Sequence, residues 1–439
     1  MTTRRDFLKN TLITTAGIGL ISPTGEALAK SLRVAPSDKI RIGLIGCNGM
    51  GFANLETFLK NPECECVALC DVDESVLNRR AADVEKITKK KPKELYKDWR
   101  KLIDNKDIDL VIVGTPDHWH CLIMIAACKA GKDVYCEKPL ANSIEECNLM
   151  VKAAEKYNRV VQVGQWQRSD KHWKAAVDFI RSGKLGKIRL VRVFSYQGWC
   201  PSIPVLADEP VPTGVDYDMW LGPATKRSFN RNRFHFTFRW FWDYAGGLMT
   251  DWGVHLLDYA LYGMNVHTPK SIMAMGGKFG YPEDACETPD SLQTLYEFDG
   301  FTILWDHAIG IDDGAYGRNH GLGFVGENGT LVIDRSGWEV IPEKVNNKAR
   351  MEKVSLQKGD GKGLENHVKN MLECMKTRNR NTNASVEIGA HIAKFSHLGN
   401  IAYRTGKKLV WDGTKFTNDG DANNFLVPQY KNGWQLPVV

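Results

Sequence analysis

The chain has 439 residues, of which 43% are hydrophobic and 25% charged, and a formal net charge of +6. This composition is typical of a soluble globular protein, and the length predicts two domains. The basic residues are scattered and no nucleic-acid-binding motif is present, which argues against a nucleic-acid partner. No apolar run is long enough for a stable membrane span.

The first 29 residues resemble a twin-arginine signal peptide. Thr3-Arg4-Arg5-Asp6-Phe7-Leu8-Lys9 fills every position of the export motif, an uncharged apolar region runs from Thr11 to Ser22, and Ala27-Leu28-Ala29 offers a cleavage site. The alternative is an amphipathic N-terminal helix. We expect recognition by the twin-arginine export machinery, folding in the cytoplasm with any cofactor in place, and a periplasmic or otherwise exported protein.

From residue 38 onward the sequence alternates predicted strands and helices. Single helices separate the predicted strands, which lie at 40–45, 66–70, 110–113, 134–136 and 160–163. Such alternation indicates a parallel, doubly wound sheet. The sequence therefore predicts the α/β fold class, with an N-terminal Rossmann domain over residues 38–164.

The pattern changes after residue 165. Strand-like alternation appears at 188–194 and 291–298, and a stretch rich in proline and aromatic residues spans 198–240. This pattern is typical of an α+β domain with a mostly antiparallel open sheet, predicted over residues 165–411. A polar tail, 412–439, follows. The eleven cysteines show no CxxC pair and no Cys/His zinc spacing, so no metal site is expected.

Gly46-Cys47-Asn48-Gly49-Met50-Gly51 lies between the first predicted strand and its helix. Against the dinucleotide pattern GxGxxG, Gly46 and Gly51 fit, and Asn48 replaces the glycine that lets the backbone approach the pyrophosphate. Asparagine tolerates a left-handed φ better than most residues, and Gly49 is adjacent. We expect Gly46, Asn48, Gly49, Met50 and Gly51 to bind a dinucleotide.

Asp71 ends the second predicted strand, 20 residues past Gly51. An acidic side chain at this place accepts hydrogen bonds from the ribose 2′-OH and repels a 2′-phosphate, so NAD is favoured over NADP. The alternative is a helix N-cap, which Asp71 or Asp73 could supply.

Two further segments leave predicted strands at the edge where open α/β sheets bind ligands. Thr115-Pro116-Asp117-His118-Trp119-His120 follows one strand, and Thr115, Pro116 and His120 are expected to wall the cofactor. The alternative is that His118 and His120 are simple turn and cap residues. Glu137-Lys138-Pro139 follows the strand at 134–136, and Glu137 and Lys138 are also expected to bind the cofactor. Lys138 is a candidate base or proton donor beside a nicotinamide ring, and its alternative is a surface lysine in a loop.

A helix is predicted from about 247 to 262, and Asp251 and His255 have the i, i+4 spacing that places both on one helix face. A solvated helical pair is the alternative. Oxidation of an alcohol requires a group that removes the O–H proton. Lys138 and His255 are the candidates.

Aromatic side chains concentrate before this helix. Aromatic faces suit the apolar face of a pyranose ring, so Trp199, Trp240 and Trp242 are candidates for sugar contacts, with Arg233 binding hydroxyls. The alternative is that these aromatics pack the sheet, and we expect most of them to do so.

Together these motifs resemble the Gfo/Idh/MocA family, named for glucose–fructose oxidoreductase and inositol dehydrogenase. The resemblance covers nearly all of the chain after the leader and rests on the glycine loop, Asp71, Thr115-Pro116 with His120, Glu137-Lys138-Pro139, Gly164 with Arg168, and Asp251-x-Gly253-x-His255. It implies that Lys138 and His255 are catalytic and that Asp251 supports them. Arg168 is expected to bind substrate.

Two positions depart from the family pattern: Asn48, and Asp117, which stands where many members have asparagine. Trp220-Leu221-Gly222-Pro223 and the run at 239–244 resemble a secreted bacterial branch of the family. Family members commonly pair through the open face of the second-domain sheet, so a homo-oligomer is expected.

The leading hypothesis is an exported NAD-dependent oxidoreductase that acts on a secondary alcohol of a sugar, glycoside or polyol. Because free NAD is scarce outside the cytoplasm, we expect the cofactor to stay tightly bound. One alternative is NAD-dependent glycoside cleavage, in which oxidation at C3 acidifies the C2 proton and elimination expels the aglycone. A second alternative is a carbohydrate-binding relative without catalysis.

Overall fold

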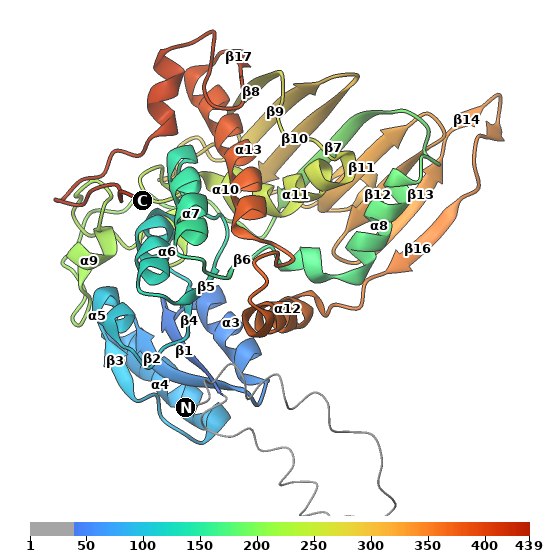
Figure 1. Cartoon of the computed structure of the whole chain (residues 1–439). Coiled ribbons are helices and arrows are strands. Elements are labelled where there is room, and N and C mark those ends of the chain that lie inside the picture. The colour runs from blue at the N-terminus through green and yellow to red at the C-terminus, as the bar shows by residue number, and fades with distance from the viewer. Residues whose placement is uncertain (1–38) are drawn as a thin grey trace, which may run out of the picture. The chain divides into compact units, whose positions relative to one another are not determined.

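Two β-sheets organise the chain (Figure 1). The computed structural model describes residues 39–439, so the predicted signal peptide, residues 1–29, lies outside the described residues. None of the described helices combines the length and apolarity needed to cross a membrane.

The first sheet is fully parallel, with the strand order β3-β2-β1-β4-β5-β6. Its strands are β1 (Ile40–Ile45), β2 (Cys64–Cys70), β3 (Glu94–Tyr96), β4 (Leu110–Val113), β5 (Asp133–Cys136) and β6 (Val161–Val163). The order reverses between β1 and β4, which is the switch point where open α/β sheets bind ligands. This confirms the predicted Rossmann arrangement. The short edge strand β3 was not predicted, because its three residues form no apolar run.

Helices cover both faces of this sheet. They are α3 (Gly49–Leu59), α4 (Glu74–Thr88), α5 (Trp99–Asp104), α6 (His120–Lys129) and α7 (Ile144–Lys156). Asp73 caps α4 by accepting from the Ser75 amide, and Ser143 caps α7 by accepting from the Glu146 amide. A late helix, α12 (Gly363–Thr377), packs beside α3 and adds Val368 to the core on that face.

The second sheet has nine strands in the order β16-β13-β12-β11-β7-β10-β9-β8-β17. They are β7 (Ile188–Gln197), β8 (Ser271–Gly277), β9 (Ser291–Phe298), β10 (Phe301–Ile309), β11 (His320–Gly326), β12 (Gly329–Asp334), β13 (Gly337–Pro342), β16 (Val354–Lys358) and β17 (Leu409–Val410). Strands β7 and β10 run parallel and the other pairs of this sheet are antiparallel. This confirms the predicted mostly antiparallel sheet.

Helices on one face of the second sheet complete the fold. They are α8 (Lys171–Arg181), α10 (Gly247–Asp251), α11 (Gly253–Met264) and α13 (Val386–Thr405). The remaining elements are α9 (Tyr217–Leu221), the hairpin β14 (Lys344–Val345) and β15 (Lys348–Ala349), and the 3₁₀ turns η2 (Asp117–Trp119), η3 (Trp166–Ser169), η4 (Thr237–Trp240), η5 (Ala315–Gly317) and η6 (Asp421–Leu426).

Helix α13 joins the cores of the two sheets. Val386 and Ala393 pack into the core beside the Rossmann sheet, whereas Phe395 and Leu398 pack into the core under the nine-stranded sheet. Because one helix contributes to both, residues Ile40–Val439 form a single compact unit. The edge of the first sheet is thereby held at a fixed position against α10 and α11.

The predicted polar tail, 412–439, packs against both domains. Phe416, Ala422 and Leu426 join the core under the nine-stranded sheet, and residues 430–439 fold back onto the Rossmann domain. The Trp434 ring lies 4.9 Å from the Trp119 ring and 6.2 Å from the Trp99 ring, measured between centroids. The Tyr430 hydroxyl donates to Glu146 Oε1 at 2.6 Å. The tail therefore adds apolar contacts to the core of the first domain.

We expect Trp434→Ala to destabilise the protein, because it removes an aromatic ring that contacts two tryptophans. Truncation of a fully buried tryptophan costs about 3–5 kcal/mol, and the partly buried Trp434 should cost about 2 kcal/mol. Thermal denaturation followed by circular dichroism should show a melting temperature lowered by a few degrees. Val438→Ala, at a residue that is 98% exposed, is the control. Equal melting temperatures for both variants would contradict a stabilising tail.

Candidate functional site

The glycine turn between β1 and α3 forms a cradle at the switch point of the first sheet. Gly46 has a φ of +82°, and a Cβ there would lie 2.6 Å from the backbone of Gly114. A Cβ at Gly51 would lie 2.1 Å from the carbonyl oxygen of Gly46. Asn48 itself is extended, with a φ of −95°, and Gly49 takes the left-handed conformation at +47°. The asparagine is therefore accommodated without strain, and the N-terminus of α3 faces a site suited to a pyrophosphate.

Asp71 lies at the end of β2 and lines the same pocket. Its carboxylate accepts from the Cys47 amide at 2.8 Å and from the Asp73 amide at 3.0 Å. Burial raises its pKa, and the hydrogen bonds from these amides oppose that rise. Asp73 is the N-cap of α4, so the capping alternative does not apply to Asp71. Asp71 is thus placed to receive a ribose hydroxyl.

One pocket extends from the glycine turn to Lys138. Ten of the predicted cofactor residues line it: Gly46, Asn48, Gly49, Met50, Gly51, Asp71, Thr115, Pro116, Glu137 and Lys138. A glycine cradle, a helix N-terminus and an acidic side chain are the features that hold a dinucleotide. The residues present therefore fit NAD.

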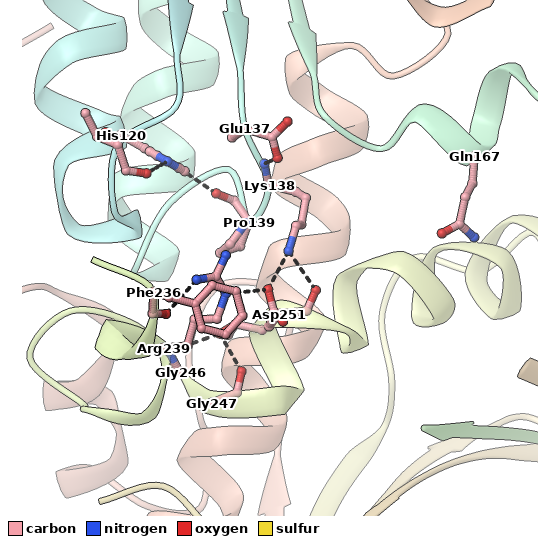
Figure 2. Close-up of polar contacts among 12 residues, drawn as sticks. His120, Glu137, Lys138, Pro139, Gln167, Phe236, Arg239, Gly246, Gly247 and Asp251 are labelled. Atoms are coloured by element: carbon pink, nitrogen blue, oxygen red, sulfur yellow. Dashed lines mark hydrogen bonds and ion pairs between the residues drawn. The ribbon is translucent and has the colours of Figure 1, made fainter. Parts of the chain in front are cut away.

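His120 is the predicted cofactor residue that does not line this pocket. It is buried, and its Nδ1 lies 2.8 Å from the Pro139 carbonyl oxygen while its Nε2 lies 2.9 Å from the Thr115 carbonyl oxygen (Figure 2). His120 therefore ties together the two loops that carry Thr115 and Lys138.

The segment 198–240 forms the opposite wall of the pocket. It contributes Met219, Trp220, His235, Phe236, Phe238 and Arg239. The segment is fastened to the turn after Asp71: the Asp216 amide donates to the Val72 carbonyl at 2.9 Å, and His235 Nε2 lies 2.9 Å from Asp73 Oδ2. The wall is therefore anchored to the domain that binds the dinucleotide.

Lys138 and Asp251, which both line the pocket, form an ion pair (Figure 2). Lys138 Nζ donates to Asp251 Oδ1 at 2.6 Å and to the Asp251 carbonyl oxygen at 3.0 Å. Arg239 Nε approaches the same Oδ1 at 3.2 Å. Burial alone would raise the pKa of Asp251, but Lys138 and Arg239 outweigh it and hold that pKa well below its usual value. The carboxylate is therefore ionised and fixes the ammonium group.

The sequence predicted one continuous helix from 247 to 262, and this is wrong in one respect: the structure has two helices there. α10 ends at Asp251 and α11 begins at Gly253. In a continuous helix the Asp251 carbonyl would accept from the His255 amide. Instead it accepts from Lys138, and the His255 amide donates to the Trp252 carbonyl at 3.0 Å. The break thus frees a carbonyl for the lysine, and Asp251 and His255 do not share one continuous helix face.

His255 lies just beyond the break and is 7% exposed. Its ring centroid is 6.5 Å from the Trp166 ring and 6.3 Å from the Trp252 ring. Among the described residues, no group hydrogen-bonds its Nδ1. Burial lowers the pKa of His255, and the nearby Lys138 lowers it further. The imidazole is therefore neutral at neutral pH and able to accept a proton.

Arg168, predicted to bind substrate, is paired internally. Its Nε donates to both carboxylate oxygens of Asp258, at 2.8 Å and 2.9 Å, and its guanidinium lies 4.5 Å from the Tyr262 ring centroid. It is absent from the residues that line the dinucleotide pocket. In this structure Arg168 braces α11 against the end of the Rossmann domain.

Internal contacts also hold three other predicted substrate residues. Trp240 is buried in an aromatic cluster. Trp242 Nε1 donates to the Glu287 carbonyl at 3.0 Å, and Arg233 Nη2 donates to the Ser228 carbonyl at 2.6 Å. Trp199 differs: it is 50% exposed, and its ring lies 6.0 Å from the ring of Phe236, which lines the pocket.

The structure adds site residues that sequence reasoning missed. Asn54, buried on α3, donates to Glu137 Oε1 at 2.7 Å. Gly164 makes room for this carboxylate, since a Cβ there would lie 2.7 Å from Glu137 Oε1. A polar residue on the buried face of α3 was the available signal for Asn54. Arg239 stood in an aromatic run, and no sequence pattern assigned it to Asp251.

Asp117 is a buried carboxyl group in the dinucleotide pocket. Burial raises its pKa to about 7, against the opposing effects of Lys138 and Arg239, while Asp251 raises it further. An unfolded aspartate has a pKa of about 3.9. Between these two values the unfolded chain is ionised and the folded chain is protonated at this site, so stability falls as the pH rises toward 7.

We therefore expect Asp117→Asn to raise the melting temperature at pH 8, where the wild-type protein buries a charge. The gain should shrink toward pH 4, where the wild-type carboxyl group is neutral. Thermal denaturation between pH 4 and pH 8 measures this difference. Asp313→Asn, at an exposed position, controls for the loss of one negative charge. A gain that is constant across the pH range would contradict the raised pKa.

Comparisons with known proteins agree with this geometry. Residues 40–165 match the sequence profile described as "Oxidoreductase family, NAD-binding Rossmann fold", and residues 187–331 match "Oxidoreductase family, C-terminal alpha/beta domain". Both profiles belong to the Gfo/Idh/MocA family. Levoglucosan dehydrogenase in complex with NADH and levoglucosan has a similar fold, with a TM-score of 0.61 at 20% identity over 85% of this chain and 99% of that chain. Aldose-aldose oxidoreductase from Caulobacter crescentus has a similar fold too, with a TM-score of 0.60 at 20% identity over 85% of this chain and 100% of that chain.

Curated relatives match over a shorter range. A "Glycosyl hydrolase family 109 protein" of Shewanella sp. (strain W3-18-1) is 29% identical over 201 residues, which are 42% of this chain and 44% of that protein. An "Alpha-N-acetylgalactosaminidase" of Shewanella oneidensis is 28% identical over 202 residues, with the same coverage. The match thus spans less than half the length of these relatives. With both of its sheet domains matched, the chain belongs to the Gfo/Idh/MocA family of oxidoreductases and contains the NAD-binding Rossmann fold of that family.

Proposed function

We propose that the protein is an exported NAD-dependent oxidoreductase that acts on a secondary alcohol of a sugar, glycoside or polyol and keeps its cofactor between turnovers. The Lys138–Asp251 pair carries this proposal, because it holds an ammonium group in the lining of a dinucleotide pocket. The neutral, buried His255 lies close enough to Lys138 for the lysine to lower its pKa.

The chemistry divides between these groups. NAD, when bound, accepts a hydride from the alcohol carbon, so the chain must accept the hydroxyl proton. His255, which is neutral, is suited to accept it. Lys138, oriented by Asp251, donates a hydrogen bond to the same oxygen and stabilises its negative charge as the proton leaves. In the reverse reaction the protonated His255 returns the proton, while Lys138 keeps its hydrogen bond to the same oxygen.

Two features support retention of NAD. Asp71 suits a ribose 2′-OH and disfavours a 2′-phosphate. The segment 198–240 covers the pocket from the side opposite the glycine turn and is fastened at Val72 and Asp73. Together with the predicted twin-arginine leader, these features favour a protein that leaves the cytoplasm with its cofactor already bound.

The protein purified from the cytoplasm of an expression host should carry NAD in a molar amount close to that of the chain. Mass spectrometry of the supernatant after denaturation measures this and separates NAD from NADP. Phe236→Ala should lose much of the nucleotide during gel filtration, because Phe236 forms part of the covering wall. Met275→Ala, at a residue that is 72% exposed on β8, is the control. A wild-type protein without nucleotide would contradict cofactor retention.

Incubation with a panel of monosaccharides, disaccharides and polyols, each paired with a reducible sugar that reoxidises the bound NADH, should yield keto products, detected by mass spectrometry. Lys138→Ala should lower turnover by about 10²–10⁴-fold, the usual contribution of an acid–base group. The NAD content of each variant, measured in parallel, separates lost chemistry from lost cofactor. Lys129→Ala, at an exposed lysine of α6, is the control. Unchanged turnover in Lys138→Ala would contradict the proposed acid–base role of Lys138 and favour a non-catalytic carbohydrate-binding protein.

A second candidate, glycoside cleavage, is favoured by the names of the curated relatives, a glycosyl hydrolase family 109 protein and an alpha-N-acetylgalactosaminidase. Here a base must also remove the proton at C2 of the sugar, and His255 is suited to this step. The same panel distinguishes the two candidates if it contains aryl glycosides. Release of the aglycone without net NADH indicates cleavage, whereas accumulation of a keto sugar indicates oxidation alone.

A further inference from the structure

A partly buried arginine without a carboxylate partner lies beside His255. Arg335 occupies the turn between β12 and β13, and its guanidinium lies 5.1 Å from the Trp166 ring centroid and 4.5 Å from the Trp252 ring centroid. The same two rings flank His255. Among the described residues, Arg335 forms no salt bridge. Its charge is therefore uncompensated next to the proposed catalytic groups.

The turn that carries Arg335 is fixed in place. Asp334 Oδ1 accepts from the amides of Ser336 at 2.7 Å and Gly337 at 3.2 Å. The Asp334 carbonyl oxygen lies 3.0 Å from His172 Nε2, and its other carboxylate oxygen pairs with Arg318 at 3.0 Å. A side chain held on such a turn is ordered before any ligand arrives, which lowers the entropic cost of binding.

Hydrogen-bonding groups around Arg335 remain without protein partners. Gln167 Oε1 accepts from Arg335 Nε and Nη2 at 3.3 Å each, which leaves Nη1 without a hydrogen bond among the described residues. The Nε2 amide of Gln167, in a residue 1% exposed, has no partner in the described part of the chain, and neither has His320 Nε2. Figure 2 shows Gln167 to one side of Lys138 and Asp251, with no contact to either. Buried polar groups usually have partners, so these groups point to a polar ligand.

The charges around His255 favour a negative ligand. Lys138 and Arg239 together exceed the single negative charge of Asp251. Arg335 adds a third positive charge. Burial lowers the pKa of His255 and His320, and Arg335 lowers both further. Three other carboxyl groups lie near this cluster. Burial raises the pKa of Asp117 to about 7 and also raises the pKa of Glu137. Asp334 is paired with Arg318.

We propose that Arg335, Gln167 and His320 form an anion subsite beside His255, and that the substrate is a sugar that carries a carboxylate or sulfate group. This rests on the proposed function, which places the reacting hydroxyl at Lys138 and His255. The free edge of a guanidinium binds a planar carboxylate with two parallel hydrogen bonds. The Gln167 amide and the His320 ring then bind neighbouring sugar oxygens and orient the ring.

Calorimetric titration of the full protein with its bound cofactor tests the subsite. The probes are methyl glucuronide and methyl galacturonide, the methyl ester of each, methyl glucoside, and glucose 6-sulfate at constant ionic strength. At least one anionic sugar should bind ten or more times more tightly than its neutral counterpart. Preference for the uronides identifies a carboxylate ligand, and preference for glucose 6-sulfate identifies a sulfate ligand.

Variants of Arg335 test whether this residue causes the preference for anionic sugars. Arg335→Gln should bring the ratio of anionic to neutral affinity close to one, and Arg335→Lys should keep an intermediate ratio. Arg350→Gln, which removes the same charge at an exposed site, should keep the wild-type ratio. If Arg335→Gln does not fold, the comparison of anionic with neutral sugars on the wild-type protein still tests whether an anion subsite exists.

Equal affinity for anionic and neutral sugars, or no binding of any anionic sugar, would overturn the subsite. Oxidation of neutral sugars by the same preparation would then leave the proposed function standing. Tight binding of an anionic sugar that is neither oxidised nor cleaved would support the subsite and contradict the proposed function instead.

Discussion

The ion pair between Lys138 and Asp251 is the constraint on which the rest of the site depends. It joins the end of β5 in the Rossmann sheet to the end of α10, whose Met249 packs into the core under the second sheet. In a buried lysine–aspartate pair both charged groups lose their hydrating water, so the pair needs further hydrogen bonds to be stable. The broken helix supplies one through the Asp251 carbonyl, and Arg239 supplies another. Helix α13, which contributes to both cores, holds the two ends of the pair at this separation.

The cofactor side of the site could be predicted from the sequence because parallel strands end at one edge of a sheet. Residues that follow β1, β2, β4 and β5 must meet there once the strand order is known. Gly46, Asp71, Thr115 and Lys138 accordingly line one pocket. His120 shows the limit of this reasoning. Its position in the chain is right, but its ring nitrogens face the Thr115 and Pro139 carbonyls, a detail of loop packing that strand order does not specify.

The break at Trp252 could not be predicted, because its cause lies far away in the chain. The apolar pattern continues through the break, and the group that takes the Asp251 carbonyl is a lysine 113 residues earlier. The pairing of Arg168 could not be predicted for the same reason, since its partner Asp258 lies 90 residues later. Among the aromatics of 198–240, the choice between Phe236 at the pocket and Trp240 in the core depends on how this segment attaches to the turn after Asp71.

Different elements build the two parts of the site, and this separation has a consequence for specificity. The dinucleotide pocket is made by the Rossmann edge and the segment 198–240. The groups around His255 come instead from η3 and from strands of the second sheet, through Gln167, His320 and the turn that bears Arg335. A change in that turn alters the charge presented to a substrate without touching the glycine cradle or Asp71. Under the proposed function, the residues that retain the cofactor and those that select the substrate can therefore vary independently, with Lys138 and Asp251 shared by both sets.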